Sequence, residues 1–301
     1  MSPAGTEVVT EVDGHRLTLS NLAKVLYPAT GTTKGEILDY YVRIAPVLLP
    51  HIADRAVTRI RWPHGVAKQS FFEKNAPAGA PSWLKTVSVP TTGSRSASGE
   101  SGELRFPVVD GLAALVYLVN LASLELHVHQ WKVSLEGVPS NPDRLVVDLD
   151  PGDGAGLMQC CEVALLARSL LASRDLEAKP VTSGSKGLHL YVPLDGSLSA
   201  DESTALAKDL AEELQAAHPT LVTATMTKAR RAGKVFFDWS QNSGSKTTVA
   251  PYSLRGKERP TVATPLTWAE VEEGANDELG LDQFTYAEVL ARVADLGDLF
   301  A

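Results

Sequence analysis

The chain has 301 residues, 44% of them hydrophobic and 21% charged, which is enough for one large folded domain or two packed lobes. No run of 18 apolar residues is present, and the N-terminal residues lack the basic and apolar parts of a signal peptide. We therefore expect neither a membrane span nor a secretory leader. The net charge of −8 argues against a polyanionic partner at first sight. It comes entirely from residues 270–301, however, and the first 269 residues are balanced.

Two stretches within the balanced part carry an excess of basic residues. Residues 55–74 hold five bases against one acid, and residues 226–259 hold eight bases against two acids. Each stretch can be an ordinary solvated face or a contact surface for phosphates, and local basic patches matter more than the total charge for phosphate partners.

The first unit in chain order is a loop followed by a helix, residues 18–49. Thr33 followed three residues later by Glu36 is a capping-box pattern, and apolar residues then recur at helical spacing. Lys24 and Lys34 flank the loop that leads into this helix N-terminus, a place that favours anions. The plainer alternative is a pair of ordinary surface lysines.

Residues 56–62 and 70–74 are expected to form two short strands, and the second contains the adjacent Phe71 and Phe72. Neighbouring side chains in a strand point to opposite faces, so we expect one ring in the core and the other exposed. An exposed ring among basic residues is a stacking platform for a nucleic-acid base. Burial of both rings is the alternative that this pattern leaves open. Further along, the Gly/Ser-rich stretch 91–102 predicts a mobile loop between strands.

Residues 124–131 alternate between apolar and polar side chains, which predicts a strand with one buried face. The polar face would present Glu125, His127 and His129. A His-x-His pair can bind a metal, but no partner set of Cys or His occurs elsewhere in the chain. We therefore expect one histidine to meet a phosphate or to hydrogen-bond locally.

The segment RLVVDLDPGDG, residues 144–154, is typical of a buried strand that ends in two aspartates. Asp148 and Asp150 would point to the same face, about 7 Å apart along the strand. Two carboxylates so placed repel unless cations lie between them, and hard oxygen ligands suit Mg²⁺ or Mn²⁺. The same letters are good turn chemistry, and the motif alone does not decide between the two readings. A calcium loop is excluded because Asp153 and Gln159 occupy the positions that need Gly and Glu.

A loop of residues 183–189, Ser-Gly-Ser-Lys-Gly-Leu-His, lies between expected strands at 178–182 and 188–192. Glycines and hydroxyl groups are typical of loops whose backbone N–H groups cradle phosphates, although this is not a Walker A loop. Further on, an apolar strand at 234–239 delivers a third carboxylate, Asp238.

From residue 144 onward the expected order of elements is β-α-β-β-α-β, which predicts a ferredoxin-like or RNA-recognition-type sheet. Cys160 and Cys161 are adjacent within a helical pattern, so we expect free buried thiols, as in a reducing cytoplasm. Helices are expected over residues 113–121, 156–173, 200–217 and 286–296.

Three motifs in this order resemble the archaeo-eukaryotic primase superfamily: Asp148-x-Asp150, Ser183-x-x-Lys186-x-x-His189, and Asp238 on an apolar strand. Longer segments are similar to the polymerase domain of bacterial ligase D and its stand-alone relatives, namely TLSNLAKVLYPATGTTK, FFEK, VVDLDPGDG, VTSGSKGLHLYVPL and DWSQNSGSKTTVAPYSLRG. The resemblance implies a mixed α/β (α+β) fold in a single primase-polymerase domain, residues 1–301. An N-terminal αβ lobe (1–140) would pack on an RRM-like, ferredoxin-like catalytic lobe (141–301) with acidic C-terminal helices.

The resemblance implies a DNA-dependent nucleotidyltransferase that extends primers and fills short gaps in repair or end joining, with a preference for ribonucleotides. It further implies two Mn²⁺ or Mg²⁺ ions, and as ligands DNA with gaps, overhangs or 5′-phosphate ends and the nucleoside triphosphates. An ATP-dependent DNA ligase and Ku are the expected protein partners. The expected location is the bacterial cytoplasm, at the nucleoid.

Residue roles follow from the same resemblance, position by position. The metals would be held by Asp148, Asp150 and Asp238. The incoming nucleotide would meet His127, Ser183, Lys186, His189, Arg231, Gln241, Lys246 and Arg255. The 5′-phosphate across a gap would meet Asn21, Lys24 and Lys34, and the template would pack on Phe71 and Phe72.

Two positions depart from the family pattern: His129 stands where we expect proline, and the loop at 93–102 looks longer. Either could change the preference for DNA without touching the chemistry. The chain has no Lys-x-Asp-Gly motif, so we expect no ligase activity in it, whether it is a free-standing protein or an excised domain. The alternatives to a repair polymerase are a catalytically silent DNA-end-binding module that recruits a ligase, a metal-dependent nuclease, and a dedicated primase.

Overall fold

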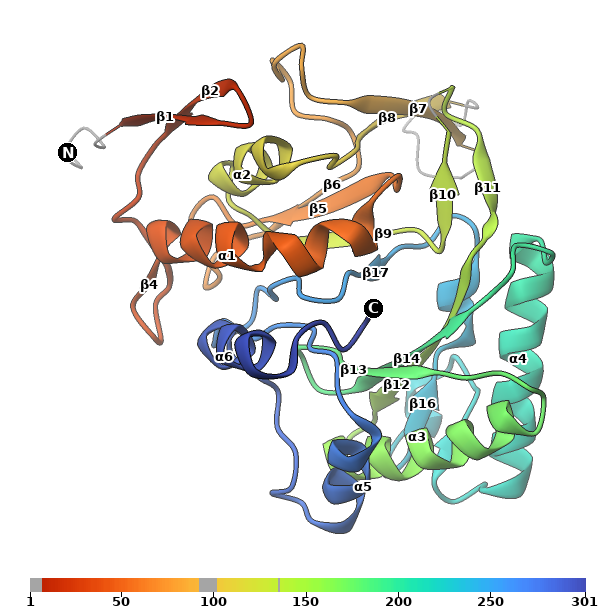
Figure 1. Cartoon of the computed structure of the whole chain (residues 1–301). Helices are drawn as coiled ribbons and strands as arrows, with labels where there is room; N and C mark the ends of the chain where they lie inside the picture. Colours follow the sequence, from red (N-terminus) through yellow and green to blue (C-terminus); the bar gives the residue numbers. More distant parts are fainter. Residues whose placement is uncertain (1–6, 92–101, 135) are drawn as a thin grey trace.

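The computed structural model describes residues 7–91, 102–134 and 136–301. The predicted Gly/Ser-rich loop at 93–102 lies almost wholly outside the described residues. Within the described ranges, no helix combines the length and the apolarity that crossing a membrane requires. Two β-sheets dominate the fold, and helices cover one face of each (Figure 1).

The first sheet has four strands, and β5 and β9 are its central pair. Helices α1 (Lys34–Ile52) and α2 (Leu112–Asn120) cover one face of this sheet, and their buried side chains share a single core cluster with Leu124, Leu126 and Val128 of β9. The strand order is β17 (Thr248–Val249), β9 (Ser123–Val128), β5 (Val57–Arg61) and β6 (Phe71–Glu73).

The predicted capping box sets the start of α1. The Thr33 side chain accepts a hydrogen bond from the Glu36 backbone N–H, and the Glu36 carboxylate in turn accepts one from the Thr33 N–H at 2.8 Å. The box satisfies two of the backbone N–H groups that a helix start leaves without partners.

The second sheet is built around β12 (Arg144–Pro151), with strand order β13-β14-β12-β16-β15. This order places the first and third strands of the β-α-β-β-α-β unit at the centre, as the predicted ferredoxin-like fold requires. The other strands are β13 (Lys179–Thr182), β14 (Leu188–Pro193), β15 (Val222–Thr223) and β16 (Val235–Phe237), and the helices are α3 (Leu157–Ala172), α4 (Ala200–Ala217) and α5 (Trp268–Asn276).

Side chains of β12 alternate between the two faces of this sheet. Leu145, Val147 and Leu149 are fully buried in the core cluster that contains α3 and α4. Val146 lies on the opposite face and shares a smaller cluster with Val249 of the first sheet. The aspartates at even positions of β12 therefore lie on the face that is turned toward the first lobe.

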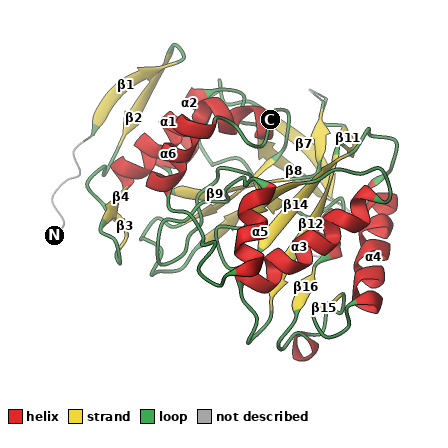
Figure 2. Ribbon diagram, turned by 60° about the horizontal axis from the view of Figure 1, so that its bottom comes forward, coloured by secondary structure: helices red, strands yellow, loops and turns green. Residues whose placement is uncertain are grey.

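The C-terminal part of the chain crosses back to the first lobe. Tyr252, Leu254 and Val262 belong to the core cluster of α1, as does Val289 of helix α6 (Tyr286–Leu296). Helices α1 and α6 lie side by side (Figures 1 and 2). The division into lobes at residue 140 stays a prediction, since β17 and α6 both pack on the first lobe.

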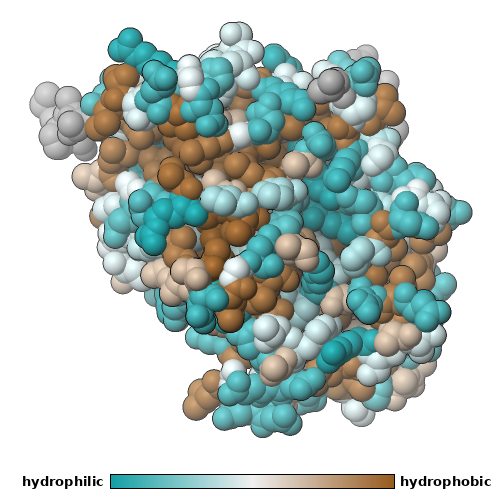
Figure 3. Space-filling view, in the orientation of Figure 1, coloured by the Kyte–Doolittle hydropathy of each residue, from teal (hydrophilic) through white to brown (hydrophobic). Residues whose placement is uncertain are grey.

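Smaller elements complete the structure, and both cysteines of α3 are buried free thiols, as predicted. In the space-filling view, hydrophobic residues gather over the α1 and α2 side, and hydrophilic residues surround a hollow beside it (Figure 3). The remaining hairpins are β1–β2 (Val8–Val12, His15–Leu19), β3–β4 (Val25–Tyr27, Thr32–Thr33), β7–β8 (Thr86–Thr91, Gly102–Pro107) and β10–β11 (Trp131–Val133, Pro139–Pro142), and the 3₁₀ turns are η1 (Lys228–Arg230) and η2 (Trp239–Asn242).

Candidate active site

The three predicted aspartates converge at one end of the second sheet. Asp148 is buried on β12, and Asp150, two residues on, is exposed. Asp238 follows the neighbouring strand β16 directly, and its backbone N–H donates to the Asp148 carbonyl at 2.8 Å. The sheet ladder therefore fixes the spacing of the three residues.

The three carboxylates lie close enough for their charges to act on one another. Partial loss of solvent around the carboxyl group, followed by the charges of Asp148 and Asp238, raises the pKa of Asp150 to about 6, although the charge of Arg231 opposes the rise. Like charges gathered without a cation have this effect on a carboxyl group. The arrangement favours a positively charged ligand at this end of the sheet.

The Asp238 carboxylate is held by its own neighbours. It accepts hydrogen bonds from the Ser240 N–H and from Gln241 Nε2, both at 3.1 Å, and Lys246 Nζ lies 4.0 Å from Oδ2. Gln241 and Lys246, two of the predicted nucleotide ligands, are thus gathered on the third aspartate. Among the described residues, no group of three or more His, Cys, Asp and Glu side chains is already placed to hold a metal ion.

The donor set nevertheless fits a hard divalent cation. All three side chains offer carboxylate oxygens, the ligands that Mg²⁺ and Mn²⁺ prefer. The only basic contact to the β12 pair within hydrogen-bond distance in the described chain comes from His189, whose Nε2 lies 3.2 Å from Asp148 Oδ1. His189 is the direct cross-strand neighbour of Asp148.

The loop of residues 183–189 is a compact turn built around Ser183. The Ser183 Oγ atom accepts hydrogen bonds from the N–H groups of Ser185 and Gly187 at 3.2 and 3.1 Å. Gly184 has a φ of +65°, and a Cβ there would lie 2.6 Å from Arg255 Cγ, so no other residue fits. Lys186, by contrast, is exposed at the loop's surface.

Arg231 approaches the aspartates from the loop that precedes β16. Its guanidinium lies over the Phe236 ring, 3.4 Å from the centroid, and its Nη2 donates to the Met226 carbonyl at 2.7 Å. Its charge lowers the pKa of Asp150, so it belongs to the electrostatic surroundings of the carboxylates.

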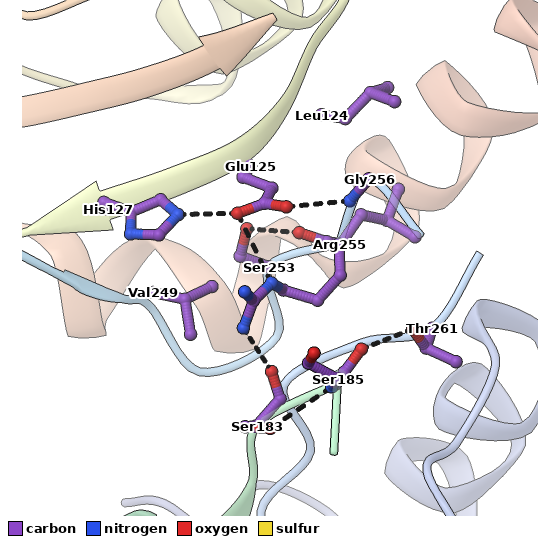
Figure 4. A network of polar contacts seen from close by, with 12 residues as sticks. Leu124, Glu125, His127, Ser183, Ser185, Val249, Ser253, Arg255, Gly256 and Thr261 are labelled. Atoms are coloured by element: carbon purple, nitrogen blue, oxygen red, sulfur yellow. Dashed lines mark hydrogen bonds and ion pairs between the residues drawn. The ribbon is translucent and has the colours of Figure 1, made fainter. Parts of the chain in front are cut away.

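A network around Glu125 joins the two lobes (Figure 4). The Glu125 carboxylate accepts from His127 Nε2 at 2.7 Å and from the Gly256 N–H at 2.8 Å, and Arg255 Nε lies 3.3 Å away. Sequence reasoning placed Glu125 on the face of His127 but gave it no role. The alternation of residues 124–131 was a sufficient signal for the shared face, whereas the contacts to Arg255 and Gly256 come from distant parts of the chain.

The predicted 5′-phosphate residues also lie together. Lys34 is 4% exposed, and its Nζ donates to the Ser20 carbonyl at 2.6 Å and to Asn120 Oδ1 at 2.7 Å. Burial and the charge of Lys24 lower the pKa of Lys34 to about 8. Lys24 and Asn21 are exposed beside it. Asn120, 86 residues away from Lys34 along the chain, was missed because no local pattern marks it.

The expectation that one of the two phenylalanines enters the core is wrong. Phe71 is 44% exposed and Phe72 is 58% exposed. The physical reason is that β6 is a three-residue edge strand, so neither of its faces is covered enough to bury a ring. Glu73 anchors the strand through ion pairs to Arg59 and Arg61 at 2.9 and 2.6 Å.

The two rings differ in the face of the sheet from which they project. Phe72 pairs across the sheet with Ile60, which in turn pairs with Glu125. Directly opposite residues in antiparallel strands share a face, so Phe72 lies on the same face as Glu125 and His127, and Phe71 lies on the other.

A family model described as "LigD, primase-polymerase domain" matches residues 33–300. The chain belongs to this family. It is 52% identical over 289 residues, 94% of its length, to the multifunctional non-homologous end joining DNA repair protein LigD of Mycobacterium tuberculosis, and 31% identical over 283 residues to the bifunctional LigD of Bacillus subtilis. The chain spans about a third of the length of the mycobacterial relatives, 36%.

A solved structure matches the fold over nearly its whole length. The polymerase domain of Mycobacterium tuberculosis ligase D, in complex with DNA, aligns with a TM-score of 0.87 at 52% identity and covers 94% of this chain and 96% of that one. The resemblance read from the motifs is confirmed, and so is the mixed α/β primase-polymerase fold. As a LigD primase-polymerase domain, the chain is a nucleotidyltransferase enzyme of the polymerase type.

Proposed function

We propose that this LigD primase-polymerase domain extends primer ends and fills short gaps in DNA during end joining or excision repair. The observation that carries the proposal is the convergence of Asp148, Asp150 and Asp238 at one end of the second sheet, on the face turned toward the first lobe. The likeness to a polymerase domain bound to DNA, and to relatives named for non-homologous end joining, supports it.

The three aspartates would hold one or two divalent cations, Mn²⁺ or Mg²⁺. The cations would lower the pKa of the primer 3′-hydroxyl and stabilise the charge of the transition state. In the reaction, the 3′-hydroxyl releases its proton to solvent and its oxygen forms a bond to the α-phosphorus of the nucleotide. The bond from the α-phosphorus to the bridging oxygen breaks, and pyrophosphate leaves.

The other side chains of the site bind and orient the nucleotide. Positive charges around the carboxylates would neutralise the triphosphate by charge-assisted hydrogen bonds. Gln241 and Lys246 already lie at Asp238, and His189 lies at Asp148. The binding site for the polyphosphate would therefore be adjacent to the carboxylates that hold the metal. The phosphate-binding set would be Lys186, Arg231, Lys246 and Arg255, and His127 and His189 would complete the nucleotide pocket.

A preference for ribonucleotides would come from the loop of residues 183–189. The Ser183 Oγ atom accepts two backbone N–H groups, which leaves its own hydroxyl proton free to donate. A hydrogen bond to the 2′-hydroxyl of about 0.5–1.5 kcal/mol corresponds to a preference of roughly 2- to 13-fold.

The first lobe would hold the DNA. Lys24, Lys34 and Asn21 form the site for the 5′-phosphate on the far side of a gap, and the exposed rings of β6 pack on the template. Lys34 donates only to neutral oxygens, so its charge remains available to a phosphate.

The relatives named for non-homologous end joining support a wider assignment. We propose that the domain works beside an ATP-dependent DNA ligase and Ku, in the bacterial cytoplasm at the nucleoid. Primer extension on gapped DNA tests the central part: growth of a labelled primer supports the proposal. Shortening of the primer indicates a nuclease, binding without growth indicates an end-binding module, and equal activity with and without a downstream 5′-phosphate favours a dedicated primase.

A further inference from the structure

Glu125 is a buried carboxylate whose contacts come entirely from hydrogen-bond donors and cations. It is 3% exposed, and its two oxygens are used by His127 Nε2 at 2.7 Å, by the Gly256 N–H at 2.8 Å and by Arg255 Nε at 3.3 Å. The contact to Arg255 is an ion pair without hydrogen-bond alignment, because Arg255 Nε has no aligned acceptor among the described residues. The carboxylate therefore has a hydrogen-bonded partner on each oxygen.

The contacts keep this carboxylate ionised. Burial alone would raise the pKa of Glu125, but the hydrogen bond from His127, the charge of Arg255 and the Gly256 N–H together lower it to about 2. An ionised carboxylate can only accept hydrogen bonds, so Nε2 of His127 must carry a proton. In the neutral imidazole, Nδ1 is then the atom with the free lone pair.

Arg255 extends the network from the first sheet to the loop of residues 183–189 in the second sheet. Its Nη1 donates to the Ser183 carbonyl at 2.5 Å, and Thr261 Oγ1 donates to the Gly184 carbonyl beside it (Figure 4). The Arg255 side chain also packs closely on Gly184, where a Cβ would lie only 2.6 Å from Arg255 Cγ. Within the described residues, neither Nη2 of Arg255 nor Nδ1 of His127 has a hydrogen-bond partner, so both are available to a ligand.

We propose that Glu125 is a positioning residue of the nucleotide site. It fixes the tautomer of His127, whose Nδ1 can then accept a hydrogen bond from a hydroxyl of the incoming nucleotide, and it fixes the direction of the Arg255 guanidinium, which donates to phosphate oxygens. This inference rests on the proposed polymerase function. Glu125 does not touch the nucleotide, since a buried negative charge beside a triphosphate would repel it. It acts through the two side chains that it holds.

Glutamine tests the proposal because it keeps the shape of Glu125 and removes its charge. The amide N–H₂ of glutamine must face one of the donors that now surround the carboxylate, so at least one of His127, Arg255 and Gly256 loses its acceptor. Loss of a charge-assisted hydrogen bond predicts that Glu125→Gln raises the KM for the nucleotide by roughly 10- to 100-fold. The affinity for gapped DNA should change less than about twofold, because the DNA sites lie elsewhere on the first lobe.

Glu270→Gln is the matched control. Glu270 is also a partly buried carboxylate that pairs with an arginine, Arg292, but it lies on α5 and caps that helix. Both variants remove one carboxylate–arginine pair, and only Glu125→Gln should change the KM for the nucleotide. If Glu125→Gln does not fold, Glu125→Asp is measured instead, with the same expected rise in KM because the shorter side chain cannot reach both sets of donors.

A second readout follows the tautomer directly. In ¹⁵N spectra of histidine-labelled protein, at a pH where the ring is neutral, His127 should show a single tautomer protonated at Nε2, and Glu125→Gln should mix the two tautomers. An unchanged KM in Glu125→Gln, with a loss of melting temperature like that of Glu270→Gln, overturns the inference and makes Glu125 a clamp between the lobes. Failure of the parent protein to extend any primer overturns the proposed function instead, so the two failures are distinguishable.

Discussion

The ammonium group of Lys34 lies 2.7 Å from the side-chain oxygen of Asn120, at the start of α1. The Ser20 carbonyl at 2.6 Å is its second acceptor. Burial is the larger cause, and the nearby charge of Lys24 the smaller one, of the fall in the pKa of Lys34 to about 8. Two cations held together at a helix N-terminus form a site that gains from a divalent phosphate.

Removal of both lysines should abolish recognition of a 5′-phosphate. We expect gapped DNA with a 5′-phosphate to bind more tightly than the same DNA with a 5′-hydroxyl, since a terminal phosphate carries more charge than an internal one. The double change Lys24→Ala with Lys34→Ala should erase the difference and leave single-strand binding nearly intact. Anisotropy at two salt concentrations measures both affinities, and the preference should weaken as salt rises. A double mutant that still prefers the phosphate as strongly as the parent contradicts the assignment.

The preference for the 5′-phosphate should also depend on pH. In the free protein, Lys34 loses its proton as the pH rises through about 8, so the phosphate preference should decline between pH 7 and pH 9. The folded-state pKa lies below the unfolded value, so the unfolded chain binds more protons between pH 8 and 10.5, and stability should rise with pH there. A parallel titration of Lys34→Arg, which stays charged, is the control. Equal decline in both proteins would show that Lys34 is not the titrating group.

The two phenylalanines of β6 should differ in their contribution to DNA binding because they project from opposite faces of the sheet, not because one is buried. Phe72→Ala should weaken binding of gapped DNA by about 5- to 150-fold, the equivalent of about 1–3 kcal/mol for one base stacked on an aromatic ring. Phe71, on the opposite face of the same strand, is the matched control and should have the smaller effect. Both variants should keep melting temperatures close to that of the parent, because both rings are exposed. A large loss of stability in Phe72→Ala would mean that the ring packs on protein rather than on DNA.

His129 should make the protein sensitive to acid. It is 3% exposed, stacked on Trp131 at 4.1 Å between ring centroids, and burial lowers its pKa to about 3. The folded-state pKa lies below the unfolded value of about 6.5, so the stability from a neutral His129 is complete above pH 6.5 and is lost as the pH falls from there toward 3.

Denaturant unfolding measures this contribution of His129. His129 can lower the free energy of unfolding by at most about 1.4 kcal/mol for each unit that the pH falls. The total fall in the free energy of unfolding with pH should therefore be smaller in His129→Gln than in the parent. His64→Gln, at an exposed histidine, serves as the control. The same acid dependence in His129→Gln and in the parent would show that other groups cause it.

Local sequence patterns were sufficient to predict helix starts and the two faces of a strand, because both depend on neighbouring residues. The capping box at Thr33 and the helical spacing that follows it correctly predicted where α1 begins. Alternation along β12 correctly placed Asp148 on the face opposite Leu149, because the two-residue period of a strand is a property of the backbone.

Tertiary placement explains what the sequence could not show. The exposure of both rings of β6 depends on that strand being at the edge of its sheet, which the adjacent Phe71 and Phe72 do not reveal. Asn120 reaches Lys34, and Arg255 reaches Glu125, across 86 and 130 positions of the chain respectively. Such pairs carry no local signal, because their members meet only when distant parts of the chain fold together.

The most direct test of the account is primer extension on gapped DNA with Mn²⁺ by the parent, by Asp148→Ala and by Asp238→Ala, with DNA binding measured on the same samples. We predict that the parent extends the primer, that chelation of the metal stops extension, and that both variants fail to extend while they bind DNA at least as well as the parent. Extension by either variant near the parent rate would contradict the assignment of these carboxylates as the catalytic centre.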